Sequence, residues 1–296
     1  MKKLMLTLTI LLGLAAAGEA KIKVVTSLSD LAEFTKAVGG DKVEVDFLVR
    51  GSQNPHYIEI KPSYMLKLKS ANLFVTIGMQ LEIWAPQIID GSRNPNLIVV
   101  DCSKNVKKLE VPSVKVDASM GDVHPFGNPH YWLDPENVKA ILQEILDNLV
   151  KVSPADAEYF KSNLKAYMKK LDAKMAEWML LMSPLKGTKL VTYHTSFSYF
   201  VERFGLSVVG YVEPKPGIPP TPSHSTELIQ LMRSSGVKIV GLEQYYEDNT
   251  PGQIAIAAGA RLIRLCTSVG GMDGTGDYFQ LIDHNVRAIV SAVKGS

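Results

Sequence analysis

Cysteine and net charge are both scarce in this 296-residue chain. Only two cysteines are present, which excludes a disulfide-rich scaffold. Lys and Arg number 32 against 30 Asp and Glu, and basic residues do not alternate with aromatic ones, so nucleic acid is not an expected partner. Low-complexity arms and long repeats are also missing, and nothing favours an adhesin or interaction scaffold.

The pairing state of the two cysteines stays open. Cys102 and Cys266 each follow an apolar, strand-like run, Leu97–Val100 and Leu262–Leu265. One disulfide and two free buried thiols are both compatible with this pattern, because pairing cannot be deduced from sequence. Metal ligation by Cys266 is a lesser alternative.

Extended apolar stretches are confined to the N-terminus. Lys2 and Lys3 precede the stretch Leu4–Ala17, and Gly18-Glu19-Ala20 follows as a cleavage site, which is the pattern of a secretory signal. The stretch is short for a membrane span of about 20 residues, although an uncleaved anchor helix is the alternative. We expect residues 1–20 to be removed, leaving a soluble periplasmic protein that begins near Lys21. No cysteine follows the stretch, so a lipid anchor is not expected.

Short β-branched runs alternate with segments of helical spacing along the rest of the chain, which predicts an α/β fold with mostly parallel sheets flanked by helices. The runs form two sets of four: Ile22–Thr26, Val43–Leu48, Leu73–Ile77, Leu97–Val100, then Lys189–Tyr193, Ser207–Val212, Val237–Leu242, Arg261–Leu265.

A long helical tract separates the two sets. Asp134-Pro135 and Ser153-Pro154 are helix-start signals, and no glycine or proline interrupts Pro154–Met182. A single helix of this length would measure roughly 40 Å and join two lobes rigidly, while two shorter helices are the alternative. The predicted division is a signal peptide, an N-terminal lobe, a connecting helix and a C-terminal lobe, at residues 1–20, 21–150, 151–184 and 185–296.

Three histidines indicate a metal site. The tetrapeptide Asn-Pro-His-Tyr occurs twice and contributes His56 and His130, while His194 ends the run Lys189–Tyr193. All three map to the carboxyl ends of predicted strands, where open α/β sheets gather their ligands. Each alone is better explained as a hydrogen-bonded histidine, but three imidazoles at one sheet edge predict a shared transition-metal site.

The other histidines give weaker signals. His124 lies in the polar loop 117–127, where an exposed side chain is expected and a weak auxiliary role in metal capture is the alternative. We expect His224, at the start of a helix, on the surface, and His284, inside the last helix, in packing or on the surface.

The motifs Asn-Pro-His-Tyr-x-x-x-x-Pro-Ser, Asn-Pro-His-Tyr-Trp-Leu-Asp-Pro and Tyr-His-x-x-Phe-x-Tyr-Phe, together with the signal peptide, resemble the metal-binding solute receptors of zinc and manganese ABC importers. The resemblance covers nearly all of the chain after the signal. It implies that His56, His130 and His194 bind the metal between the lobes. Histidine at the third position, where manganese receptors often carry glutamate, favours zinc.

The fourth ligand departs from that family. Its members usually supply an aspartate after the strand corresponding to Arg261–Leu265, and Thr267 stands there instead. The candidates are a water molecule, Glu243, Glu59 and Asp273. Glu243 is the first choice among side chains, because it follows a predicted strand at the same sheet edge.

The resulting hypothesis is a non-enzymatic, monomeric receptor that captures Zn²⁺ and passes it to an ABC-type membrane permease. The same role for Mn²⁺ or another divalent transition metal is the first alternative. A zinc-dependent hydrolase is the second, since three histidines and water also form a catalytic site. No His-Glu-x-x-His or comparable motif places a general base beside the metal.

Overall fold

Two four-stranded parallel sheets form the framework of the protein in a computed structural model, which describes residues 20–295. The first sheet has the order β2-β1-β3-β4, with β1 Ile22–Leu28, β2 Val43–Val49, β3 Leu73–Thr76 and β4 Ile98–Asp101. The second has the order β6-β5-β7-β8, with β5 Lys189–Thr192, β6 Ser207–Tyr211, β7 Ile239–Glu243 and β8 Arg261–Leu265. The α/β prediction is confirmed. The predicted signal peptide lies outside the described residues except for Ala20.

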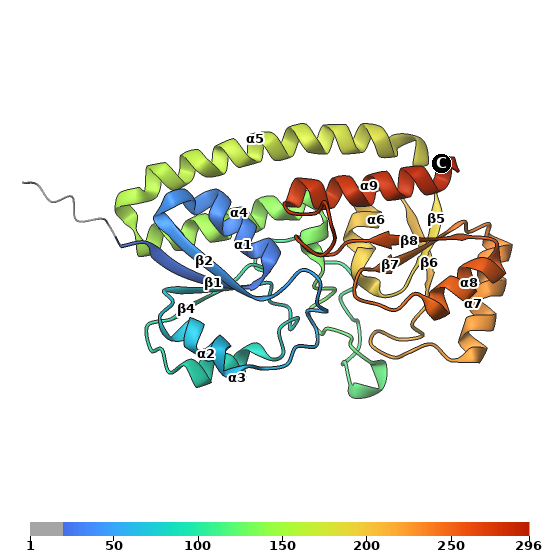
Figure 1. The fold of residues 1–296 in the computed structure, drawn as a ribbon, viewed down its shortest axis with the longest axis horizontal. Helices are drawn as coiled ribbons and strands as arrows, with labels where there is room; N and C mark the ends of the chain where they lie inside the picture. Colours follow the sequence, from blue (N-terminus) through green and yellow to red (C-terminus); the bar gives the residue numbers. More distant parts are fainter. Residues whose placement is uncertain (1–19, 296) are drawn as a thin grey trace, which may run out of the picture.

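Helices flank both sheets and define two lobes (Figure 1). The N-terminal lobe carries α1 Ser29–Gly39, α2 Pro62–Lys69, α3 Ala85–Ser92 and α4 Pro135–Val152. The C-terminal lobe carries α6 Ser198–Phe204, α7 Pro222–Ser235 and α8 Asn249–Ala258, and the chain closes with α9 Tyr278–Lys294. Asp134 caps α4 by accepting a hydrogen bond from the Glu136 amide, as its sequence signal predicts.

One uninterrupted helix, α5 Ala157–Met182, joins the lobes. Its 26 residues correspond to about 39 Å at 1.5 Å per residue, so the alternative of two shorter helices is wrong. It packs on α1 and α4 at one end and on α9 at the other, and runs along the edge of the molecule above both sheets (Figure 1). Phe160, Leu171 and Trp178 on this helix are fully buried. We retain residues 151–184 as the proposed connecting segment.

Hydrogen bonds from fully buried aromatic side chains to backbone carbonyls join the lobes directly. The indole of Trp132, just before α4, donates to the carbonyl of Thr267, just after β8, at 2.8 Å. The hydroxyl of Tyr278 at the start of α9 donates to the carbonyl of Trp132, also at 2.8 Å. Both partners of these hydrogen bonds are buried. Moving the lobes apart would break the bonds and leave a buried polar group without a partner, which costs free energy.

A second contact holds the loop after β8 against α1. The Ser29 hydroxyl donates to the Val269 carbonyl at 2.7 Å, and the Val269 amide donates to the Asp30 carboxylate at 3.0 Å. Burial raises the pKa of Asp30 to about 7. The loop that carries Thr267 is therefore tied to the opposite lobe.

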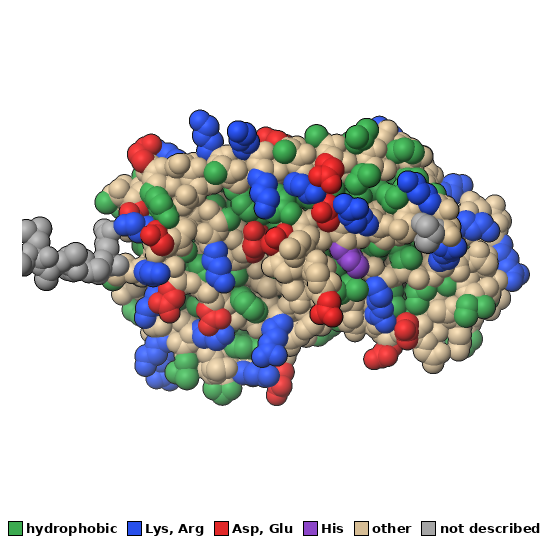
Figure 2. Space-filling model, turned by 45° about the horizontal axis from the view of Figure 1, so that its top comes forward, with side chains coloured by type: hydrophobic (Ala, Val, Ile, Leu, Met, Phe, Trp, Pro, Cys, Tyr) green, Lys and Arg blue, Asp and Glu red, His purple; other side chains and the backbone are tan. Residues whose placement is uncertain are grey.

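Both cysteines are free and buried, so the alternative of a disulfide is wrong. Basic and acidic side chains are interspersed on the face toward which α5 lies (Figure 2). Within residues 20–295, none of the helices has the length and apolar character needed to span a membrane.

Candidate metal centre

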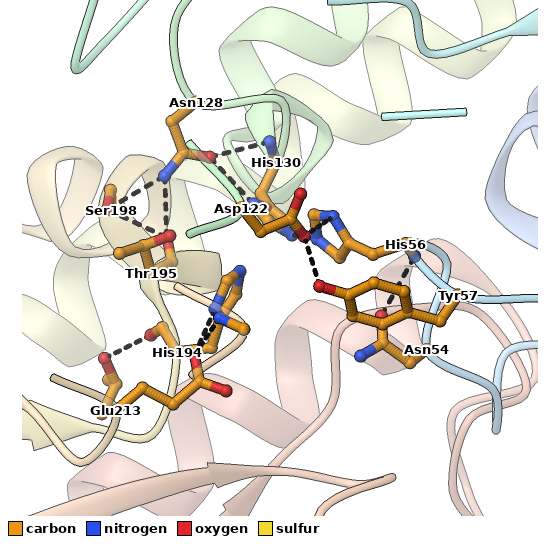
Figure 3. Close-up of polar contacts among 12 residues, drawn as sticks. Asn54, His56, Tyr57, Asp122, Asn128, His130, His194, Thr195, Ser198 and Glu213 are labelled. Atoms are coloured by element: carbon orange, nitrogen blue, oxygen red, sulfur yellow. Dashed lines mark hydrogen bonds and ion pairs between the residues drawn. The ribbon is translucent and has the colours of Figure 1, made fainter. Parts of the chain in front are cut away.

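His56, His130 and His194 converge between the lobes (Figure 3). His56 lies in the loop after β2, His130 precedes α4, and His194 follows β5. One ring nitrogen from each lies within 4.8 Å of the other two, and the Nε2 atoms of His56 and His130 are 3.1 Å apart. The side chains are buried, with exposed fractions of 3%, 0% and 2%. The three histidines therefore meet, as the sequence predicts, where the carboxyl edges of the two sheets face each other.

The repeated Asn-Pro-His sequence builds the same turn twice. The Asn54 side-chain oxygen accepts the His56 amide at 3.0 Å, and the Asn128 oxygen accepts the His130 amide at 2.9 Å. Asparagine favours such turns because its side chain bonds the backbone two residues ahead. Each proline also restricts its own φ angle, so both imidazoles extend from stiff supports.

Each imidazole has a polar partner at its Nδ1 atom. His56 Nδ1 lies 2.8 Å from an Asp122 oxygen, and His194 Nδ1 lies 2.8 Å from a Glu213 oxygen. His130 Nδ1 lies 2.9 Å from the Asn128 side-chain oxygen. With the Nδ1 protons of His130 and His194 donated to these oxygens, their Nε2 atoms keep the lone pair for a metal, which is the usual arrangement around histidine ligands. His56 Nδ1 approaches Asp122 as an ion pair without the geometry of a hydrogen bond.

Sequence reasoning missed these three partners. Glu213 follows the strand Ser207–Val212 directly, so the same carboxyl-edge rule that selected His194 points to it as well. Asp122 had no signal beyond its place in a polar loop.

The local environment separates the proton affinities of the three rings. Burial, together with the neighbouring histidines, holds the pKa of His130 well below 6.5. Burial also lowers the pKa of His56, although Asp122 opposes the shift. Burial acts in the same direction on His194, but its hydrogen bond to Glu213 and the charges of Glu243 and Glu213 outweigh burial and raise its pKa. Two imidazoles are thus neutral at pH 7, as metal binding requires.

Glu243 ends β7 and is fully buried. Neither carboxylate oxygen has a hydrogen-bond partner among residues 20–295, and burial raises the pKa to about 7. The carboxylate interacts electrostatically with His194, but it is not one of the groups whose ligand atoms lie within 4.8 Å of each other in the described chain. Glu59 and Asp273, the other side-chain candidates, are exposed and also lie outside those groups.

Thr267, at the position of the family's aspartate, is occupied by hydrogen bonds. Its hydroxyl lies 3.0 Å from the Gln244 side-chain nitrogen, and its amide donates to the Gln244 side-chain oxygen at 3.0 Å. Gln244 also donates to the Gly51 carbonyl of the opposite lobe at 2.6 Å. Thr267 therefore takes part in a contact between the lobes. It offers no negative charge at the position where the family has an aspartate.

The expectation of an exposed His124 is wrong. Its exposed fraction is 8%, and its ring centroid lies 5.2 Å from that of His56. Contacts across the interlobe loop, which local sequence does not reveal, bury it. His224 and His284 are half-buried, each hydrogen-bonded to a backbone carbonyl, and neither belongs to a group of potential metal ligands within the described chain.

The chain is similar to known receptors over most of its length. It is 26% identical to the high-affinity zinc uptake system protein ZnuA of Bacillus subtilis, over 91% of this chain and 86% of that protein. It is 25% identical to the manganese-binding lipoprotein MntA of Halalkalibacterium halodurans, over 95% and 91%. The zinc-binding protein AdcA of Streptococcus pyogenes is 26% identical over 92% of this chain, which spans only 56% of that longer relative.

Solved structures share the fold. A crystal structure of ZnuA superposes with a TM-score of 0.80 at 24% identity, covering 92% of this chain and 99% of the other. The solute-binding protein FpvC of P. aeruginosa, in complex with Ni²⁺, also gives 0.80 at 24% identity, covering 93% and 97%. The relatives are solute receptors and not enzymes, which confirms that prediction. A family model described as ZnuA, zinc-uptake complex component A, periplasmic, matches residues 24–292, and the chain belongs to this family.

Proposed function

We propose that this protein captures Zn²⁺ outside the cytoplasm, between its two lobes, and delivers the ion to an ABC-type permease in the membrane. The observation that carries the proposal is the group formed by His56, His130 and His194, buried and with ligand atoms within 4.8 Å of one another. Zinc binds imidazole nitrogen at about 2.0–2.1 Å in tetrahedral sites, which three converging rings can supply with small adjustments. Family membership supports uptake as the purpose of binding.

The ligand chemistry favours zinc over manganese. Three nitrogen ligands suit zinc, whereas manganese prefers carboxylate, carbonyl and water oxygens. Manganese remains the second candidate because one relative is named for it. Copper binds such ligands more strongly than zinc in general, so availability outside the cytoplasm also decides the cargo.

We propose Glu243 or a water molecule as the fourth ligand. The burial of Glu243 supports the carboxylate, as do its two oxygens, which have no hydrogen-bond partner within residues 20–295. Zinc-edge absorption of the wild-type protein and of Glu243→Gln separates the two. Loss of one oxygen scatterer and weaker binding would identify the carboxylate, while an unchanged spectrum and affinity would identify water.

Metal titration tests the receptor itself. The wild-type protein is expected to bind one zinc ion per chain, competing with a fluorescent chelator, and His130→Ala should abolish that binding. His284→Ala is the matched control, because its imidazole lies outside the site. An absorption spectrum with two or fewer imidazole ligands would refute the assignment.

Delivery requires a cellular test. Cells that depend on this protein should take up little zinc from chelator-treated medium after its gene is deleted. Wild-type protein, but not His130→Ala, should restore uptake. We propose that it acts as a monomer in the periplasm after removal of residues 1–20, which N-terminal sequencing and light scattering of the purified protein can check.

A further inference from the structure

The end of the C-terminal lobe opposite His194 is formed by the starts of strands and the ends of helices. The strands of the sheet β6-β5-β7-β8 are all parallel, so their first residues share one edge. Helices α5 to α8 each lead into one of these strands, and Arg261 at the start of β8 donates to the carbonyl of Gly295, just after α9. We call this end the amino edge and define it as residues 183–189, 204–208, 233–239, 257–262 and 292–295.

The amino edge is strongly basic. It contains six basic residues and no acidic residue, although the whole chain has a formal net charge of only +2. Figure 2 shows Lys and Arg side chains gathered around the end of α9. The two arginines donate to backbone carbonyls, and none of the six residues belongs to an ion pair among residues 20–295. All six are exposed, namely Lys186, Lys189, Arg233, Lys238, Arg261 and Lys294.

The fold brings these like charges close together. Continuing the register between β5 and β7 by two residues sets Lys189 opposite Lys238. The Arg261 amide donates to the Lys238 carbonyl at 2.9 Å. Neighbouring strands lie about 4.8 Å apart, and like charges at opposed positions repel each other. Each helix C-terminus carries roughly half a negative charge, so five helix ends offset only about 2.5 of the six positive charges. The remaining positive charge favours an anionic partner.

Exposed apolar side chains accompany the positive charges. Leu180, Leu231, Ile256 and Val293 lie in the last two turns of α5, α7, α8 and α9, and they are between 40% and 82% exposed. The one aromatic residue of the amino edge, Phe204, is buried, so no ring there can stack on the bases of a nucleic acid. Basic residues beside exposed apolar ones are typical of surfaces that bind membranes, where the cations contact phosphate groups and the apolar side chains enter the interface.

We propose that the amino edge binds the surface of an anionic phospholipid membrane and holds the receptor there. His194 lies at the other edge of the same sheet, so binding through the amino edge leaves the opening between the lobes accessible. The contact needs no metal ion. It therefore goes beyond the proposed function and gives the receptor a second partner.

Sedimentation with lipid vesicles tests the proposal. The metal-free protein is prepared from Lys21 onward, because the apolar stretch 4–17 would bind lipid by itself. It should sediment with vesicles of equal parts phosphatidylglycerol and phosphatidylcholine, but not with phosphatidylcholine alone. Concentrated salt should release it, because the Debye length falls from about 10 Å at 0.1 M to about 3 Å at 1 M. Absence of binding to the anionic vesicles at low salt would overturn the proposal.

Removing positive charge from the amino edge should weaken this binding. Each basic residue near an anionic surface raises partitioning about fivefold, so the triple variant Lys189→Gln/Lys238→Gln/Lys294→Gln should bind on the order of 100-fold more weakly. Its circular dichroism spectrum and zinc affinity should match those of the wild type. Unchanged vesicle binding by this variant would contradict the assignment of the surface.

A matched control removes the same charge elsewhere. Lys69, Lys165 and Lys169 are exposed on α2 and on the N-terminal half of α5, outside the amino edge. The triple variant Lys69→Gln/Lys165→Gln/Lys169→Gln should keep most of the vesicle binding. An equal loss in both triple variants would show that net charge alone drives the contact and would reject a defined surface.

A fluorescent label reports which end meets the lipid. Cys102 and Cys266 are buried, so a polarity-sensitive thiol dye should react with an introduced cysteine. The emission should shift to the blue on vesicle addition in Val293→Cys and stay unchanged in Leu66→Cys, and the reverse pattern would overturn the proposal. Retention on immobilised polyglutamate without vesicle binding would instead identify an acidic protein as the partner. Because these assays use metal-free protein, their failure leaves zinc capture untouched, and failure to bind zinc leaves their result standing.

Discussion

Replacing Glu213 by glutamine tests how the protein sets the affinity of His194 for a metal ion. Glu213 is 6% exposed, and one of its oxygens lies 2.8 Å from His194 Nδ1 and accepts the Gly217 amide at 3.0 Å. Glutamine keeps an oxygen for both contacts but removes the negative charge. Removing such a partner of a histidine ligand typically lowers metal affinity 10–100-fold, or about 1.4–2.7 kcal/mol.

The pH dependence makes this prediction specific. Glu213 and Glu243 raise the pKa of His194 above 6.5 against the effect of burial, so in the wild-type protein protons begin to compete with the metal above that pH. In Glu213→Gln the pKa of His194 falls, and this competition begins at a lower pH. The affinity deficit of the variant should therefore be greatest near pH 8 and should shrink as the pH falls toward 6.

Competition with a fluorescent zinc chelator between pH 6 and 8 measures both effects. Glu227→Gln, on the exposed surface of α7, is the control for the loss of one carboxylate. Equal affinities of Glu213→Gln and wild type at pH 8, or a deficit that grows on acidification, would refute the reasoning.

Three further results are expected. Trp178→Ala should destabilise the protein by about 3–5 kcal/mol, measured by urea unfolding, because the fully buried indole anchors α5; a loss below about 1 kcal/mol would show that the site collapses freely. Burial raises the pKa of Cys102 and of Cys266, so both thiols should react with a disulfide reagent only after unfolding, and rapid labelling of native protein would contradict their burial. Burial raises the pKa of Asp30 to about 7 and of Glu33 to about 8, so the folded state holds protons that the unfolded state releases above about pH 4. The free energy of unfolding of the metal-free protein should fall as pH rises from 5 to 8, by up to about 1.4 kcal/mol per pH unit for each of the two groups. In Glu33→Gln, Tm should depend less on pH than in the wild-type protein.

The sequence was sufficient for the fold and for the placement of His56 and His194 at sheet edges, because both follow from periodic patterns. Parallel strands place their carboxyl ends on one edge of each sheet, so His56 after β2 and His194 after β5 each lie at such an edge. That the two edges face each other depends on how the lobes pack, which the pattern does not give. The sequence was compatible with a single helix α5 or with two shorter helices. The packing of α5 against both lobes explains why it forms a single helix.

The partners of those histidines depended on loop conformation instead. Asp122 is placed by hydrogen bonds with Pro216 and Tyr57, which lie about 90 and 65 residues away in the chain, and no local pattern encodes such contacts. Thr267 stands where the resemblance implies an aspartate, which left the fourth ligand open, and its hydrogen bonds with Gln244 became visible only in the structure. Likewise, the sequence left open whether Cys102 and Cys266 form a disulfide, and only the structure shows that both are free.

The fastening of the lobes through α5, Trp132 and Tyr278 bears on the energetics of loading. A receptor whose lobes close around the bound ion buries apolar surface and shows a large negative heat capacity change on binding. Here that surface is already covered, so calorimetry should find a heat capacity change close to zero. Osmolytes such as sucrose, which act by exclusion from exposed surface, should leave the occupancy almost unaltered.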